Sequence, residues 1–139
     1  MSARVFQTGS EEETIRLGRE LAAELARPSC ILLIGNLGAG KTTLAKGIVA
    51  GLTGISEDEI TSPTFTLIHE YAAGIYHLDL YRLETEQEVA RLGLDDLLDV
   101  NSILLVEWGE RFPTLFPADR IEITIDRQTN GRLIRVSNV

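Results

Sequence analysis

Two stretches of the chain are apolar at nearly every position. They are residues 31–34 (ILLI) and residues 102–106 (SILLV). A strand that is covered on both faces in a parallel sheet has no polar face, so it gives a continuous apolar run of this kind. We predict that both stretches are buried parallel strands.

Other segments have the patterns of helices. Ser10 is followed by three glutamates, which is the form of a capping box at the start of a helix, and apolar residues at helical spacing follow it. A second helix is predicted for residues 41–52. Residues 86–92 and 94–98 are predicted to be two shorter helical pieces.

Alternating apolar and polar residues predict further strands. Residues 121–125 alternate in this way, and a Thr-Asn-Gly turn leads from them into residues 133–136. Residues 66–71 and 75–80 flank a short turn and predict a second hairpin. With a short strand at residues 4–7, these elements predict one α/β domain with a mixed sheet and an antiparallel end.

Length and composition fit a single domain over residues 1–139. Of the 139 residues 44% are hydrophobic, and a chain of this length buries roughly two-thirds of its unfolded surface. The single cysteine, Cys30, lies in an apolar stretch, and we find no secretory leader and no apolar stretch near the roughly 20 residues that cross a bilayer. We therefore expect a cytoplasmic protein without a membrane segment.

The charge balance argues against a protein that binds RNA on its own. The net charge is -8, from 21 acidic and 13 basic residues, whereas binding to nucleic-acid phosphates requires an excess of positive charge. Only two of the basic residues are lysines, Lys41 and Lys46, and the first lies in the glycine-rich stretch GNLGAGKTT at 35–43.

That glycine-rich stretch has the spacing of a phosphate-binding loop. Gly35, Gly40, Lys41 and Thr42 fit the pattern G-x-x-x-x-G-K-[ST] between a predicted strand and a predicted helix. Backbone N–H groups and the helix N-terminus attract phosphates, the lysine reaches the β- and γ-phosphates, and the threonine hydroxyl binds Mg²⁺. An ordinary glycine-rich turn is the alternative, and the strand-helix setting disfavours it. The loop residues predicted to bind nucleotide are Asn36, Leu37, Gly38, Ala39, Gly40, Lys41, Thr42 and Thr43.

The nucleotide is predicted to be ATP rather than GTP. Guanine-specific GTPases usually have an Asn-Lys-x-Asp element, and neither lysine of this chain is followed by aspartate two places on.

Two acids are candidates for holding Mg²⁺, directly or through water, and for orienting the attacking water. Glu107 follows an apolar run, so we expect its carboxylate at the carboxyl edge of the sheet near Thr42. Asp79 lies in IYHLDL, whose alternation places it on one face with His77. Either acid could instead be a solvated acid at a strand end, and the residues alone leave open which one binds Mg²⁺ directly. His77 is predicted to be a structural partner of that face rather than a catalytic base.

Two further features have a functional and a structural interpretation. Residues 61–66 are rich in hydroxyl groups around Pro63, as a loop that senses the γ-phosphate or Mg²⁺ would be, or as a plain loop before a strand would be. Trp108 is either core packing or a platform at the site.

The sequences GNLGAGKTT, SPTFTLIHEY, HLDLYRL and LLVEWGER, in this order, closely resemble the TsaE (YjeE) family, and the resemblance covers nearly the whole chain. That family is the ATPase component of bacterial tRNA threonylcarbamoyladenosine synthesis. The resemblance implies a single P-loop ATPase domain, a P-loop NTPase-like three-layer sandwich with a mixed, mainly parallel central sheet and antiparallel edge strands. It also implies ATP, with ADP as product, and Mg²⁺. The implied partners are the TsaB and TsaD subunits, which transfer threonylcarbamoyl to adenosine in tRNAs that read codons beginning with A, so that tRNA is contacted only through the complex.

The resemblance also assigns roles to residues by position. The implied catalytic residues are Lys41, Asp79, Glu107 and Trp108, and the implied Mg²⁺ ligands are Thr42, Glu107 and Asp79. Beyond the phosphate loop, Thr64 falls in the switch-like loop of the family. The adenine is expected near the first strand and helix, with contacts from Thr8, Glu11 and Arg132.

Two alternatives remain beside an ATPase subunit. A small-molecule kinase usually needs an arginine-bearing lid, and the acidic region after residue 84 has only Arg82, Arg91 and Arg111 nearby. A nucleotide-gated binding module with incidental hydrolysis is the second alternative. Because the sequence shows no obvious internal arginine finger, we expect weak ATPase activity from the chain alone and stimulation by its partners.

Overall fold

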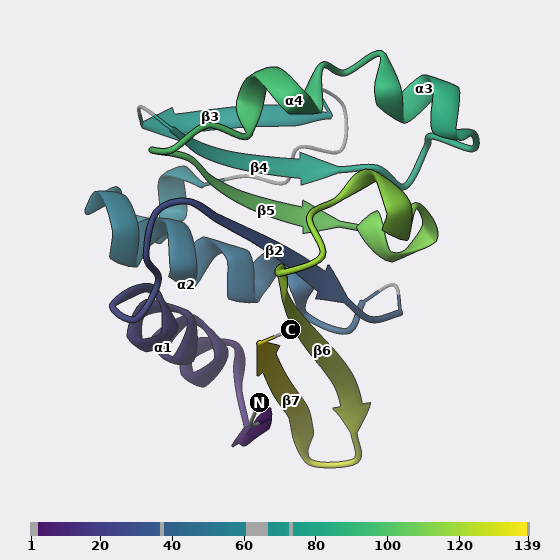
Figure 1. Ribbon diagram of the computed structural model, residues 1–139. Coiled ribbons are helices and arrows are strands. Elements are labelled where there is room, and N and C mark those ends of the chain that lie inside the picture. Colours follow the sequence, from purple (N-terminus) through teal and green to yellow (C-terminus); the bar gives the residue numbers. More distant parts are fainter. Residues whose placement is uncertain (1–2, 37, 61–66, 73, 139) are drawn as a thin grey trace.

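The computed structural model describes residues 3–36, 38–60, 67–72 and 74–138. It contains seven strands: β1 (Ala3–Thr8), β2 (Ser29–Ile34), β3 (Ile68–Ala72), β4 (Ile75–Asp79), β5 (Ile103–Glu107), β6 (Ile121–Gln128) and β7 (Gly131–Asn138). They form one sheet in the order β1-β7-β6-β2-β5-β4-β3 (Figure 1).

The sheet is mixed. Strands β6, β2, β5 and β4 are parallel to one another and form its centre, while β3 at one edge and β7 and β1 at the other are antiparallel to their neighbours. The expected parallel arrangement therefore holds for the central strands, and the expected antiparallel strands lie at the edges. The carboxyl ends of the four parallel strands share one edge of the sheet, where ligands bind in open α/β sheets.

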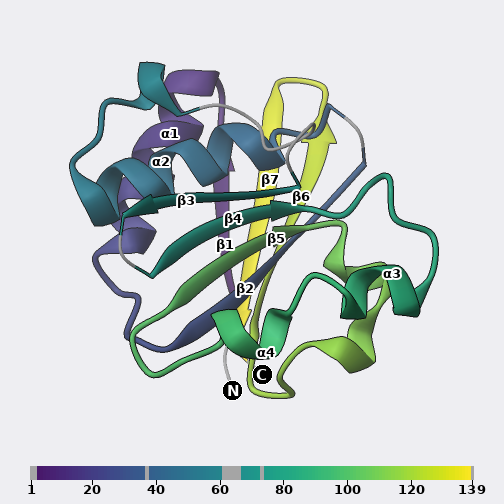
Figure 2. The same cartoon turned by 90° about the horizontal axis from the view of Figure 1, so that it is seen from above.

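Helices cover both faces of the sheet. The helices α1 (Glu11–Ala22) and α2 (Lys41–Thr53) lie on one face, and the short helices α3 (Glu86–Ala90) and α4 (Leu94–Leu97) lie on the other (Figure 2). Each face has its own hydrophobic core. Along β4, Ile75 belongs to the core beneath α1 and α2, whereas Leu78 belongs to the opposite one, so the predicted alternation of this strand is present.

The two long helices pack unusually closely, through glycines. A Cβ atom on Gly47 of α2 would lie 2.2 Å from the carbonyl oxygen of Ile15 in α1, and a Cβ atom on Gly18 would lie 2.6 Å from that of Leu44. Neither position has room for a side chain. This packing fixes α2, whose first residues carry the phosphate-loop motif, against the rest of the domain.

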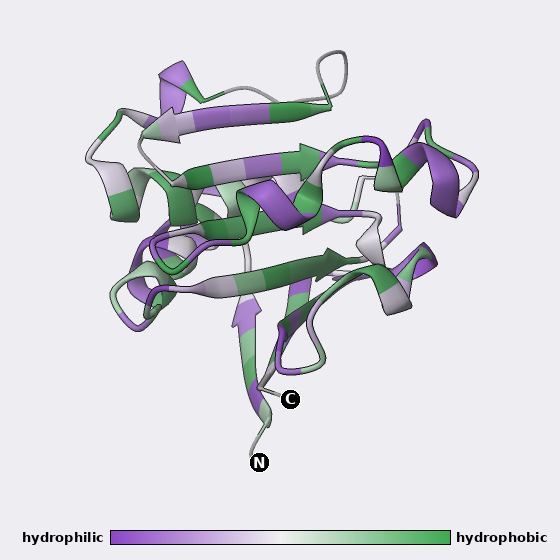
Figure 3. Ribbon diagram, turned by 45° about the horizontal axis from the view of Figure 1, so that its top comes forward, coloured by the Kyte–Doolittle hydropathy of each residue, from purple (hydrophilic) through white to green (hydrophobic). Residues whose placement is uncertain are grey.

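Local sequence patterns predicted most elements correctly. Both apolar runs are buried strands, and α1 begins after Ser10, whose side chain accepts a hydrogen bond from the backbone N–H of Glu13 at 3.1 Å. In Figure 3, β2 is hydrophobic along nearly its whole length, whereas the edge strand β3 has hydrophilic positions between hydrophobic ones. The helical pieces are shorter than predicted, and Gly93, in the left-handed conformation with φ of 73°, separates them. Residue 66, predicted to open a strand, lies outside the described residues.

Across the described ranges, none of the helices is long and apolar enough to span a bilayer.

Candidate functional site

Three of the described positions between β2 and α2 require glycine. Gly38 and Gly40 have φ of 78° and 111°, a region that residues with side chains rarely adopt. At Gly35 a Cβ atom would lie 2.6 Å from the carbonyl oxygen of Ile125 in β6, so this position also has no room for a side chain. The motif spacing therefore reflects what the backbone requires at each glycine.

The N-terminus of α2 is open to an anion. Among the described residues, Gly40 gives this helix no side-chain cap, and its first turn contains no acidic residue, whereas the first turn of α1 has three. The first backbone N–H groups of a helix have no partner within the helix and carry a partial positive charge. This end of α2 therefore suits phosphate or another anion.

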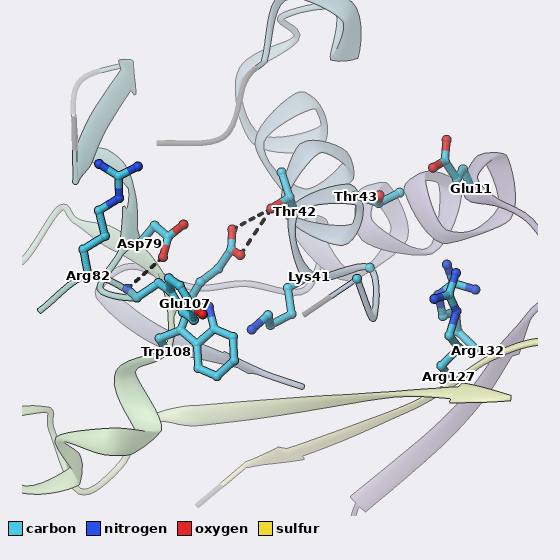
Figure 4. Close-up of a pocket in the computed structure, with 13 residues that line it drawn as sticks. Glu11, Lys41, Thr42, Thr43, Asp79, Arg82, Glu107, Trp108, Arg127 and Arg132 are labelled. Atoms are coloured by element: carbon cyan, nitrogen blue, oxygen red, sulfur yellow. Dashed lines mark hydrogen bonds between the residues drawn. The ribbon is translucent and has the colours of Figure 1, made fainter. Parts of the chain in front are cut away.

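A cavity of about 510 Å³ lies against this helix end (Figure 4). Its walls come from the phosphate loop, α1, the first turn of α2, the ends of β4 and β5, and the hairpin of β6 and β7. The described residues that line it are Glu11, Gly38, Gly40, Lys41, Thr42, Thr43, Asp79, Tyr81, Arg82, Glu107, Trp108, Arg127 and Arg132.

Strand register brings the two candidate acids to the same edge of the sheet. Asp79 of β4 pairs with Glu107 of β5, and Glu107 pairs on its other side with Leu33 of β2, the strand that leads into the phosphate loop. Both carboxylates are buried. The Thr42 hydroxyl donates to the two oxygens of Glu107, at 3.2 and 3.0 Å (Figure 4). The structure thus brings Thr42 and Glu107 into direct contact.

Asp79 has a different environment. Its Oδ1 atom accepts a hydrogen bond from the backbone N–H of Tyr81 at 3.0 Å, which shapes the turn after β4. The same turn is held by the guanidinium group of Arg111, whose Nη2 atom donates to three carbonyl oxygens: those of Leu80 at 2.5 Å, Tyr81 at 3.0 Å and Leu83 at 2.6 Å. Tyr81 and Arg82 of this turn are thereby positioned on the cavity wall.

Lys41 is buried, and its charged group has two contacts among the residues that the structure describes. Its Nζ atom donates to the carbonyl oxygen of Gly35 at 2.7 Å and lies 3.3 Å from the ring centroid of Trp108, a cation-π contact. Burial lowers the pKa of the Lys41 ammonium group below its ordinary value, and nearby carboxylates oppose this shift, namely those of Glu107, Glu110 and Asp79.

Trp108 has a strained backbone. Its φ of 68° is in the left-handed region, which costs roughly 1–3 kcal/mol for a residue other than glycine and is enriched at active sites. The ring contacts Lys41 and also Tyr81, with the two aromatic centroids 5.1 Å apart. The sequence left open whether Trp108 packs in the core or lines the site. The structure shows both: Trp108 lines the cavity and packs against the core beneath α3 and α4.

Two arginines of the cavity lie directly opposite each other. Arg127 of β6 pairs in register with Arg132 of β7, and both line the cavity beside the phosphate loop (Figure 4). The Nε atom of Arg132 donates to the carbonyl oxygen of Ala39 at 2.6 Å. Like charges that face each other across two strands are unfavourable, so this pair favours an anion in the cavity. Arg127 was missed by sequence analysis, because its partner is known only once the hairpin register is known.

His77 was predicted to be a structural partner of the strand face that it shares with Asp79, and the sequence did not indicate a contact with Glu107. Its Nε2 atom lies 2.6 Å from Oε2 of Glu107, and its side chain is fully buried. The alternation in IYHLDL had placed it on the same face as Asp79, and the structure joins it to the other acid.

Some predicted residues lie away from this cavity. Thr8 is buried, and its hydroxyl is 2.7 Å from that of Thr14. It lines a second, polar cavity of about 500 Å³ that shares Arg132 with the first and is otherwise formed by Gln7, Gly9, Glu13 and residues 128–131. Asn36 and Ala39 do not line the first cavity, but their backbones close the loop, with Ala39 N–H donating to Asn36 O at 3.0 Å. Leu37 and Thr64 lie outside the described residues.

Comparison with known proteins gives a consistent result. Residues 8–134 match the family model described as threonylcarbamoyl adenosine biosynthesis protein TsaE. The tRNA threonylcarbamoyladenosine biosynthesis protein TsaE of Bacillus subtilis is 42% identical over 126 residues, which cover 88% of this chain and 77% of the relative. The protein of the same name from Haemophilus influenzae is 37% identical over 134 residues, covering 91% and 84%. The crystal structure of YdiB from B. subtilis superimposes with a TM-score of 0.79 at 32% identity, over 99% of this chain and 86% of YdiB.

Proposed function

The chain belongs to the TsaE family of tRNA threonylcarbamoyladenosine biosynthesis proteins, and we propose that it is the subunit of that pathway which binds and hydrolyses ATP. The observation that carries this proposal is the meeting of three groups at the N-terminus of α2: the Lys41 ammonium, the Thr42 hydroxyl and the Glu107 carboxylate. We assign the domain to the P-loop NTPase class, as a three-layer sandwich. The loop between β2 and α2 and the helices on both faces of the sheet support this assignment.

The residues present fit a Mg²⁺ ion that arrives with a nucleotide. Mg²⁺ prefers oxygen ligands and is usually held by one or two protein groups together with phosphates and water. Thr42 and Glu107 offer a hydroxyl and a carboxylate in contact with each other. In the described part of the chain no group of three or more His, Cys, Asp or Glu side chains is placed to hold a metal, which agrees with a site completed by phosphates rather than by protein.

Each side chain has a proposed task. Lys41 exchanges its contacts with Gly35 and Trp108 for the β- and γ-phosphates, and the facing guanidinium groups of Arg127 and Arg132 are neutralised by the polyphosphate. A bound Mg²⁺ ion would offset the charge that develops on the phosphates during transfer. Thr42 and Glu107 bind the ion or its water shell.

Asp79 is proposed to act one water further from the reaction or on the loop at residues 61–66. Its carboxylate pairs in register with Glu107 at the same sheet edge, and it already holds the turn that carries Tyr81.

The nucleoside end of ATP is proposed to extend toward the second polar cavity. That cavity shares Arg132 with the first, and its wall includes Thr8, while Glu11 lines the first cavity from α1. These positions are compatible with base and ribose contacts near the first strand and helix. We propose ATP rather than GTP because no Asn-Lys-x-Asp element is present in the sequence.

Partner subunits of the TsaB and TsaD type are proposed to complete the active site in the cytoplasm. The net charge of -8 disfavours direct binding of tRNA by this chain, so we propose that the partner subunits bind the tRNA. An arginine finger supplied from outside raises phosphoryl-transfer rates by about 10³ to 10⁵ in other P-loop enzymes. We therefore propose weak hydrolysis by the isolated chain and strong stimulation in the complex, with ATP favouring assembly through residues 61–66.

The test is to measure ATP hydrolysis and subunit association with and without both partners, each with ATP and with ADP. Stimulated hydrolysis and ATP-dependent association are expected. Equal turnover in both settings, together with association that is independent of nucleotide, would contradict the proposal.

A further inference from the structure

His77 has a contact that its position in the core does not require. We propose that His77 is a positioning residue, which holds the Glu107 carboxylate in the orientation that serves Mg²⁺ beside Thr42. This inference rests on the proposed function, because it concerns Mg²⁺ binding at that site.

Register and burial explain how His77 reaches Glu107. His77 pairs with Leu105 in the parallel ladder of β4 and β5, two positions before the pair of Asp79 and Glu107, so its ring lies on the face covered by α2. Its Nε2 atom is 2.6 Å from Oε2 of Glu107, and neither side chain is more than 5% exposed. Since an ionised carboxylate only accepts hydrogen bonds, this contact requires the tautomer with hydrogen on Nε2. The bond is short even for a charge-assisted one.

The hydrogen bond from His77 to Glu107 can persist when Mg²⁺ binds, because His77 is not a proposed ligand of the ion. Thr42 also donates to Glu107, from α2 (Figure 4). If the Thr42 hydroxyl oxygen serves Mg²⁺, its hydrogen bond to Glu107 is not a fixed support for the carboxylate. His77 approaches from β4, and its own ring is not among the proposed Mg²⁺ ligands. Hydrogen bonds of this kind to a ligating carboxylate set its orientation and tune the metal site.

The environment of Nδ1, the other ring nitrogen of His77, indicates that this histidine does more than fill space in the core. Nδ1 of His77 is buried and has no hydrogen-bond partner among the described residues. A buried polar atom without a partner is unfavourable, and an apolar side chain like that of Ile75 on the same face would avoid it. The bond between Nε2 and Glu107 compensates for this unfavourable position.

The test measures Mg²⁺ affinity directly. Mg²⁺ is titrated into the protein saturated with ADP, and the fluorescence of Trp108, the only tryptophan, reports binding because its ring adjoins Lys41 and follows Glu107 in sequence. Loss of a hydrogen bond to a metal ligand typically weakens metal affinity about 10- to 100-fold. His77→Leu, which has no donor, should raise the half-saturating Mg²⁺ concentration by about that factor. His77→Gln, which keeps an N–H donor, should restore most of the affinity.

Three controls make the result specific. ADP affinity in EDTA should stay within about twofold of wild type in both variants, because a general loss of structure would weaken it too. His69→Leu is the matched control, since His69 faces His77 across the hairpin and its ring nitrogen bonds Tyr71 instead. Wild-type Mg²⁺ affinity in a folded His77→Leu variant would overturn the inference. A wild-type protein that binds no ADP, or binds it without regard to Mg²⁺, would instead overturn the proposed function.

A second measurement needs no variant. The chain has only two histidines, so nitrogen NMR of its imidazoles resolves each tautomer. We expect hydrogen on Nε2 of His77 both without and with MgADP. Hydrogen on Nδ1 alone would exclude donation to Glu107 and overturn the inference even if the leucine variant failed to fold.

Discussion

Replacement of Lys41 by alanine gives the most quantitative prediction for the proposed nucleotide site. Lys41 already has two partners in the structure, the carbonyl oxygen of Gly35 at 2.7 Å and the ring of Trp108 at 3.3 Å. In the proposed function it exchanges these for phosphate oxygens when ATP binds. The free energy that the lysine adds to binding is therefore a difference between two sets of contacts.

The difference follows from ordinary magnitudes. Two charge-assisted hydrogen bonds to phosphates contribute about 3–6 kcal/mol together. The bond to Gly35 that is given up contributes about 1.5–3 kcal/mol, and the cation-π contact about 0.5–2 kcal/mol. The net gain is about 1 kcal/mol, or roughly a fivefold change in dissociation constant. We expect ATP to bind at least about fivefold more weakly to Lys41→Ala, because the variant also loses the attraction of the charge at longer range.

Titration calorimetry with MgATP measures the effect. Lys46→Ala is the matched control, because Lys46 is the only other lysine, lies on the same helix and does not line the cavity. It should bind ATP like wild type. Equal affinity of both variants and of the wild type would refute the assignment of Lys41 to the phosphates.

Four further results are expected. Gly47→Ala should lower the free energy of unfolding by about 1–2 kcal/mol in chemical denaturation. The steric clash of a Cβ atom 2.2 Å from a carbonyl oxygen of α1 outweighs the gain in helix propensity. A stabilised variant would contradict the described packing of the two helices. Arg127→Leu should stabilise the free protein by about 0.2–1 kcal/mol, because it removes the like charge that faces Arg132. The same variant should bind ATP more weakly in calorimetry. No change in either the stability or the ATP affinity would contradict an anion site. Burial raises the pKa of Cys30 to about 12, so at pH 8 its thiol should react with a disulfide reagent only after unfolding, and rapid labelling of the native protein would disagree. Glu107→Gln and Asp79→Asn should each slow ATP turnover by the assembled complex, the first by at least about 10²-fold, whereas wild-type rates in both would reject their roles.

The sequence was informative where a feature depends on residues close together in the chain. The apolar run at 31–34 predicts a doubly covered strand, Ser10 predicts a helix start, and the glycine spacing predicts the turn before α2, because each is governed by local backbone and solvent requirements. The contact of Thr42 with Glu107 also agrees with a simple rule, that neighbouring parallel strands end at one edge.

Features that depend on strand register or on a single dihedral angle were not predictable. The pairing of Arg127 with Arg132 needs the hairpin register, and the bond from His77 to Glu107 needs the register of β4 and β5 as well as the packing of α2. The left-handed backbone of Trp108 has no sequence signal, since that conformation normally favours glycine. Both kinds of feature come from tertiary structure.

The most direct measurement is repeated tRNA modification by this chain reconstituted with the proposed TsaB- and TsaD-type partners. The threonylcarbamoyl donor is supplied ready-made. ATP should support many rounds of modification per complex, and a non-hydrolysable ATP analogue should support no more than about one. Many rounds with the analogue would contradict a subunit that works by hydrolysing ATP, and would identify the chain instead as a nucleotide-gated binding module.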